Sequence, residues 1–164
     1  MLKRVYRVWR NPRHGAPGRA ELLALARRAA FLAGLPERPE WDLEILFTND
    51  RSMKRCNREL VGHEGTTDVI TFSYFDDAAS LFPGETAVEL VINPDAAERE
   101  GEKRKTGYSR ELALYLVHGL LHAAGEDDLE YGPRRRMRRR EREIMAVLDR
   151  EFDLSAVFPE KRRQ

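Results

Sequence analysis

The sequence predicts an α+β fold, with a small mixed β-sheet of about four strands packed with about five helices. Segments rich in β-forming residues alternate with segments of helical period, but without a strict strand–helix–strand rhythm. A chain of 164 residues is long enough for one domain with a hydrophobic core, but too short for a second domain that folds independently. We therefore expect residues 1–164 to form a single domain.

Four segments have the character of strands, at residues 5–8, 41–47, 69–75 and 87–92. In the second, Trp41, Leu43, Ile45 and Phe47 alternate with other residues, which is the period of a strand with one buried face. Helices are expected at 22–32, 50–60 and 93–100, then around the two histidines, and finally after Gly132-Pro133. Ser109 is expected to cap the histidine helix.

The histidine helix carries the strongest chemical signal in the chain. Residues 112–121 are apolar nearly all round, which is typical of a buried helix, yet His118 and His122 interrupt this burial. At i and i+4 the two side chains share one face, about 5–6 Å apart at Cβ, so both imidazoles can bind one metal ion. Gly125 should end the helix, and three carboxylates follow it directly, at Glu126, Asp127 and Asp128.

A single histidine in an apolar helix is more often a core residue than a ligand. Two buried imidazoles on one face are costly to bury without a shared partner, and the acidic residues that follow can supply a third ligand. The pattern therefore favours a metal site over a structural role.

These residues resemble a known family. The string HGLLHAAGEDD, residues 118–128, resembles the H-G-x-L-H-x-x-G-Y-D-H signature of the YbeY endoribonucleases, the rRNA maturation factors of bacteria. Asn57 and the segment GHEGTTDVITF, residues 62–72, are similar to that family's N-x-x-Y-R-G-x-x-x-x-T-D-V-L-S-F segment, and residues 89–92 are similar to its G-D-I-x-I strand. The resemblance extends from about Trp41 to Leu148.

The resemblance implies a zincin-like metal helix against the sheet, with a cleft at the C-terminal end of that helix. It also implies a metal-dependent, single-strand-specific endoribonuclease that processes the 3′ end of the small-subunit rRNA in ribosome maturation. Its partners would be ribosomal RNA and the small ribosomal subunit with its associated factors, and its cofactor one Zn²⁺ ion. Two departures stand out, because Asp128 replaces the third histidine of the signature and Val61 replaces an arginine.

The predicted metal ligands are His118, His122 and Asp128. Asp128 is preferred to its neighbours because it lies where the family pattern has its last histidine, and zinc accepts carboxylate oxygen at nearly the same distance as imidazole nitrogen. Val61 cannot bind a phosphate as the arginine of the family pattern could. The sequence identifies no general base.

Three classes of function compete. A zinc peptidase of the H-E-x-x-H type needs a glutamate after the first histidine, where this chain has Gly119. A non-catalytic, metal-stabilised RNA-binding or ribosome-binding module is the more serious alternative. Structural zinc sites usually have four protein ligands, whereas only three are found here, and an open coordination position favours catalysis.

Two basic segments are candidates for RNA contact. Arg51, Lys54, Arg55 and Arg58 lie on one arc of the short helix at 50–60, opposite Met53, Cys56, Asn57 and Leu60, and His63 follows. The last helix has seven arginines and two glutamates between Arg134 and Glu143, a local excess of +5. For both segments a merely solvated face remains the alternative.

Overall composition adds little to this. The formal net charge is +1, and the single cysteine, Cys56, cannot form an internal disulfide, which fits a reducing compartment. The N-terminus has no apolar h-region, and no apolar run approaches the ~20 residues of a membrane span. From the sequence alone we expect a soluble, cytoplasmic protein that does not act in a membrane.

Overall fold

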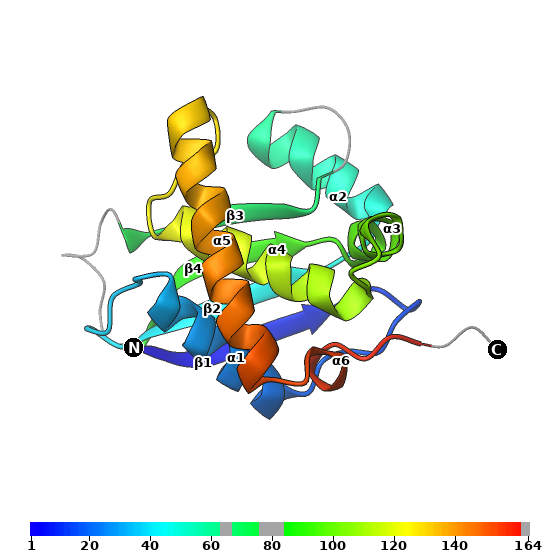
Figure 1. The fold of residues 1–164 in the computed structure, drawn as a ribbon, viewed down its shortest axis with the longest axis horizontal. Coiled ribbons are helices and arrows are strands. Elements are labelled where there is room, and N and C mark those ends of the chain that lie inside the picture. The colour runs from blue at the N-terminus through cyan, green and yellow to red at the C-terminus, as the bar shows by residue number, and fades with distance from the viewer. Residues whose placement is uncertain (63–66, 76–83, 162–164) are drawn as a thin grey trace.

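The computed structural model describes residues 1–62, 67–75 and 84–161 of the chain. Its centre is a four-stranded sheet in the order β1-β2-β4-β3 (Figure 1). The first three strands in this order are parallel, and the last runs antiparallel to β4. The strands are β1 (Leu2–Trp9), β2 (Trp41–Phe47), β3 (Val69–Ser73) and β4 (Glu85–Ile92). The predicted mixed sheet of four strands is confirmed.

Helices lie on both sides of this sheet, and most of them are on one side. Figure 1 shows α1 and α4 in front of the sheet and α5 crossing in front of α4. The helices of this side are α1 (Arg19–Leu32), α3 (Pro94–Arg104), α4 (Tyr108–Ala123), α5 (Tyr131–Glu151) and α6 (Leu154–Val157). Their buried residues form the main hydrophobic core with one face of the sheet.

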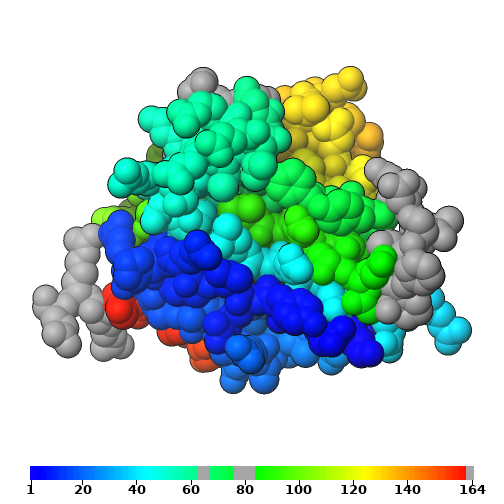
Figure 2. All heavy atoms as spheres, turned by 180° about the vertical axis from the view of Figure 1, so that it is seen from behind, coloured from blue at the N-terminus to red at the C-terminus, as the bar shows by residue number. Residues whose placement is uncertain are grey.

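The other face of the sheet carries α2 (Asp50–Cys56), which continues into a turn of π-helix, η1 (Asn57–Val61). Figure 2, seen from behind, shows this segment over the upper part of the sheet. Met53 packs there with Ile70 and Val91, which are paired across β3 and β4. The neighbouring pair, Thr71 and Leu90, points to the opposite face, toward α4.

Helix α4 is the most deeply buried helix, as its composition predicts. Leu112, Leu116, Leu120 and Leu121 have no exposed surface. The helix approaches the sheet closely at Gly119, where an added Cβ would lie 2.8 Å from Leu90 Cδ2 and 3.3 Å from Thr71 Oγ1. The absence of a side chain at this position thus allows α4 to lie directly on β3 and β4.

The ends of α4 confirm one prediction and correct another. Gly125 follows the C-cap with φ of +97°, a backbone conformation that glycine adopts without strain. Ser109, however, is not the N-cap. The helix begins at Tyr108 after Gly107, and the Ser109 hydroxyl donates to the Phe158 carbonyl at 2.6 Å instead.

Three further details differ from the prediction. The α-helix expected over 50–60 ends at Cys56 and continues as a π-helical turn, and Leu60 is 57% exposed although Met53, on the same predicted arc, is buried. Helix α5 begins at Tyr131, two residues before Pro133, and α6 adds a short sixth α-helix to the five expected. Among the described residues, no helix combines the length and apolar character that crossing a membrane requires.

Candidate metal centre

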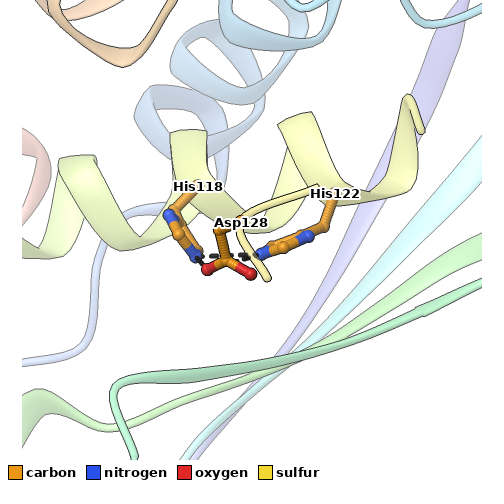
Figure 3. A group of neighbouring side chains, drawn as sticks. All are labelled: His118, His122 and Asp128. Carbon is orange, nitrogen blue, oxygen red and sulfur yellow. Dashed lines mark hydrogen bonds and ion pairs between the residues drawn. The ribbon is translucent and has the colours of Figure 1, made fainter. Parts of the chain in front are cut away.

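The C-terminal half of α4 presents His118 and His122 on one side, one turn apart. Figure 3 shows both imidazoles directed toward the carboxylate of Asp128, which enters from the loop between α4 and α5. The side chains of the three residues are 24%, 28% and 38% exposed, respectively. The cluster is therefore partly buried and open to solvent on one side.

The loop after α4 folds back along the helix end. The amide of Glu126 donates to the Leu121 carbonyl at 3.0 Å, and Asp127 uses Oδ1 to accept from the Leu129 amide at 2.9 Å. Arg134 Nε donates to the Asp128 carbonyl at 3.0 Å. Asp127 thus stabilises the turn, and the Asp128 side chain is the one that points to the histidines.

The three polar groups converge on one position. His118 Nε2 and His122 Nε2 are 3.0 Å apart, and Asp128 Oδ2 lies 3.5 Å from each of them. Ligand bonds to zinc of about 2.0–2.2 Å in tetrahedral geometry place neighbouring ligand atoms roughly 3.3–3.5 Å apart. The two separations that involve Asp128 match those of ligands around one ion, and the two Nε2 atoms are about 0.3 Å closer than that range.

The hydrogen bonds of the imidazoles explain why a cation fits between them. His122 Nδ1 is 3.1 Å from the Glu126 carbonyl, which only accepts, so the proton of a neutral ring lies on Nδ1. His118 Nδ1 forms a hydrogen bond with Glu141 Oε1 of α5, which favours the same tautomer. Both Nε2 atoms then present lone pairs to each other and to the carboxylate of Asp128, an arrangement that a shared cation stabilises.

The ionisation of His118 reflects the same crowding of acceptors. Burial alone would lower the pKa of the His118 imidazole. The hydrogen bond to Glu141 and the negative charges of Glu141, Asp68 and Asp128 outweigh burial, so the net pKa of His118 is raised above its usual value. The site attracts positive charge at the position where the three ligand atoms meet.

Two hollows adjoin the cluster. A cleft of about 730 Å³ runs along β3 and η1, and Leu60, Val61 and Phe72 contribute apolar surface to it. A smaller hollow of about 380 Å³ lies toward α3 and α5. Three residues line both hollows, namely Asp68, His118 and Asp128. The candidate metal position therefore lies where the two hollows meet.

The structure brings some of the sequence-predicted site residues together and leaves others outside the site. It brings His118, His122 and Asp128 together, as predicted, and these three form a possible metal site. The cleft is bordered by Asn57, Leu60 and Val61 of η1. It is lined by none of the four basic residues predicted to contact RNA, of which three lie in α2 and the fourth, Arg58, in η1. His63 lies outside the described residues.

Sequence reasoning missed one residue of the site. Glu141 belongs to the arginine-rich stretch of α5, where the sequence shows it only as a charge that offsets the arginines, yet it forms a hydrogen bond with His118 Nδ1. A spacing signal was present, because Glu141 lies one helical turn after Met137, which is buried with an exposed fraction of 1%. A carboxylate on the buried side of an arginine-rich helix indicates an inward partner.

Comparison with known proteins identifies the family. A family model described as Endoribonuclease YbeY matches residues 20–149. The chain belongs to the YbeY family. A relative named Endoribonuclease YbeY from Geobacter metallireducens is 32% identical over 136 residues, which cover 82% of this chain and 89% of the relative. A relative of the same name from Sinorhizobium medicae is 32% identical over 130 residues, 77% of either chain.

A solved structure shows the same fold. The solution structure of TM1509 from Thermotoga maritima matches with a TM-score of 0.54 and 19% sequence identity, over 96% of this chain and 99% of that one. Asp128 and Val61, the two departures from the family motifs that bear on metal and phosphate chemistry in the sequence analysis, both border the cleft.

Proposed function

We propose that residues 1–164 form one zinc-dependent, single-strand-specific endoribonuclease domain that processes the 3′ end of small-subunit rRNA during ribosome maturation. Family membership supports the endoribonuclease activity, since the relatives carry that name. The ribosomal RNA substrate and the small-subunit partners are proposed from the family resemblance, and a cytoplasmic location is proposed from the single cysteine, Cys56, which fits a reducing compartment.

One observation carries the proposal. The ligand atoms of His118, His122 and Asp128 converge at the mouth of an open cleft, and no fourth His, Cys, Asp or Glu joins them in residues 1–62, 67–75 and 84–161. Structural zinc sites are closed by four protein ligands, whereas catalytic sites keep a position for water or substrate. An incomplete ligand set beside a cleft supports catalysis.

The donor set suits zinc, because two imidazole nitrogens and one carboxylate are common zinc ligands. When bound, the ion would polarise a phosphoryl oxygen of the scissile phosphodiester and make water more acidic. The residues of this chain prepare the site for it. Glu141 and the Glu126 carbonyl hold the protons on the two Nδ1 atoms and thereby keep both Nε2 lone pairs directed at the shared position.

The peptidase alternative loses further support from the packing of α4. A glutamate at position 119 would have to project from the surface where Gly119 already touches Leu90 and Thr71. The position after the first histidine thus faces the sheet and not the cleft. A general base of the H-E-x-x-H kind has no room there.

The non-catalytic RNA-binding module remains the second candidate, because the same three ligands could stabilise the loop that contains Asp128. In either case we propose the basic face of α2 and η1 as an outer contact for RNA, together with His63. This face is formed by Arg51, Lys54, Arg55 and Arg58. All four residues of the basic face are exposed. Their place outside the cleft suits attraction of the RNA chain more than contact with the reacting phosphate.

Metal analysis combined with an RNA cleavage assay tests the proposal. The purified protein should contain about one zinc per chain and cut single-stranded RNA in preference to duplex RNA. A chelator should abolish cutting, and added zinc should restore it. His118→Ala protein, prepared in the same way, controls for contaminating nucleases. Stoichiometric zinc with RNA binding but no chelator-sensitive cleavage would establish the binding module instead.

A further inference from the structure

We propose that the hollow lined by Arg104, Arg134 and Arg138 binds a backbone phosphate of the RNA, next to the metal centre. This inference rests on the proposed function and assigns the position of the substrate's backbone in the same site. It gives α3 and α5, and not α2, the nearest phosphate contacts.

The position of the hollow is the first argument. It has a volume of about 380 Å³, and it shares His118, Asp128 and Asp68 with the larger cleft along β3. A strand of RNA that lies in the cleft and passes the metal ligands must therefore enter the hollow or leave the protein surface. The two hollows thus adjoin each other at two of the three metal ligands, His118 and Asp128.

The arginines differ in how far they are already engaged. Arg134 donates through Nε to the Asp128 carbonyl at 3.0 Å, and Arg104 pairs with Glu100 at 3.2 Å and lies 3.7 Å from the buried Glu111. Arg138 is exposed and forms no ion pair with a carboxylate in the part of the chain that the structure describes. The guanidinium of Arg138 is therefore the one most free to bind a phosphate. Arginine can donate two parallel hydrogen bonds to such a group.

The charge of the hollow depends on the metal. Three arginines and three carboxylates, Asp68, Asp128 and Glu141, line it, so its formal charge is zero when His118 is neutral. A bound divalent ion changes this to +2. Binding of a phosphate should thus be stronger in the metal-loaded protein, which links occupation of the hollow to the state of the site.

The larger cleft, along β3 and η1, differs from the hollow because no arginine or lysine among the described residues lines it. Leu60, Val61 and Phe72 contribute to its walls, and its only charged lining residues, among those described, are Asp68, Asp128 and the two histidines when protonated. Val61 stands where the family motif has an arginine, so this wall offers no cation to a phosphate. The apolar wall of the cleft suits the RNA bases. Proteins that bind single-stranded nucleic acid contact the bases largely by stacking on their flat faces.

RNA binding by single-charge variants tests the assignment. The probe is a fluorescent oligouridylate of about six nucleotides, and a gel run after each measurement checks that it is intact. The protein is loaded with zinc, and its metal content is verified. Arg138→Gln should weaken binding about tenfold and reduce the slope of log K against log salt by about 0.7, the value for one phosphate contact on a single strand. Arg138 is exposed, so its replacement leaves the core unchanged, and circular dichroism checks that the fold is retained.

Arg139→Gln is the matched control, because it removes the same charge from the next residue of α5, which is exposed and outside the hollow. It should change the affinity less than twofold. Equal losses in the two variants would show a general charge effect and overturn the proposal. So would a reduced slope in Arg55→Gln, on the basic face of α2, with none in Arg138→Gln.

The result is separable from the fate of the proposed function. Binding is measured without any need for cleavage, so an enzyme that fails the chelator test can still show a selective loss in Arg138→Gln. Conversely, an active enzyme with unchanged binding in Arg138→Gln would retain the proposed function and lose this inference.

Discussion

Helix α4 and the loop that follows it both contribute ligands to the candidate metal centre, but they are built differently. His118 and His122 project from a helix whose leucines at 112, 116, 120 and 121 have no exposed surface. Asp128 comes from a connection in which Leu129 is 82% exposed and the fixed points are a few hydrogen bonds. The histidines are preorganised by the core, whereas the carboxylate is held mainly by its own loop.

The difference also extends to the groups behind the ligands. His118 is held by the carboxylate of Glu141, a side chain from another helix, and His122 by the backbone carbonyl of Glu126. A backbone partner cannot be removed by substitution at position 126, but a side-chain partner can. The helix side of the site should therefore set the affinity for metal, and the loop side should tolerate exchange of one ligand for another.

Loss of either histidine should have the largest effect. His118→Ala and His122→Ala each leave two protein ligands, and we expect both proteins to contain no stoichiometric metal after dialysis, as measured by mass spectrometry of the metal content. His14→Gln is the control, because it removes another buried histidine, which pairs with Glu98 away from the site. Wild-type metal content in either alanine variant would refute the site.

The loop should show its tolerance at Asp128. We expect Asp128→Ala to lose metal on dialysis, Asp128→His to retain it, and Asp127→Ala to retain it, since Asp127 accepts from the Leu129 amide and does not reach the imidazoles. Metal content of the three variants, prepared in parallel, provides the measurement. Full occupancy in Asp128→Ala would show that Asp128 is only a solvated turn residue and leave the third ligand unassigned.

Removal of the carboxylate behind His118 should have a smaller effect. Glu141→Gln keeps the size of the side chain but loses the charge that orients the imidazole, and substitutions of this kind typically cost about 10–100-fold in metal affinity. Competition with a chromophoric zinc chelator measures the change. Glu143→Gln, exposed on the same helix, should leave the affinity unchanged. Equal affinities in the two variants would contradict the orienting role.

The two regions also differ in how well the sequence predicts them. Apolar periodicity locates the buried histidine helix, and the i, i+4 spacing places both imidazoles on one face, because these properties depend on local backbone geometry. Gly125 predicts the end of the helix for the same reason. Among three adjacent carboxylates, only the register of the family motif distinguishes Asp128, since the path of a loop is set by its tertiary contacts.

The sequence does not predict the residues that surround the metal ligands, for a related reason. The bond between Glu141 and His118 joins residues 23 positions apart, and it depends on how α5 crosses α4. An ideal helical rotation places Leu60 on the same arc as the buried Met53, but the π-helical turn at Asn57–Val61 changes that rotation, and Leu60 is exposed at the cleft. Gly119 was noted for the glutamate it lacks, whereas its close packing on the sheet needed the assembled fold to be seen.

The smallest effect that we predict concerns this packing. In Gly119→Ala the new methyl group would lie 2.8 Å from Leu90 Cδ2, and Leu90 is 1% exposed and has little space to move. Overpacking of a core typically costs about 1–3 kcal/mol, and the better helix propensity of alanine returns up to about 1 kcal/mol. We therefore expect the metal-free protein to lose about 1–2 kcal/mol of its free energy of unfolding, measured by urea denaturation.

Gly132→Ala is the matched control, because Gly132 also lies in a helix, but its added methyl would meet only Arg136 Nη1 at 3.7 Å, an ordinary contact. This variant should be as stable as the wild type or slightly more stable. A second readout links the packing to the site: if α4 is displaced from the sheet to relieve the contact, both imidazoles move with it, and metal affinity should fall in Gly119→Ala but not in Gly132→Ala. Unchanged stability and affinity in Gly119→Ala would show that the core adapts around the methyl group, and that the position of the histidines does not depend on this close approach.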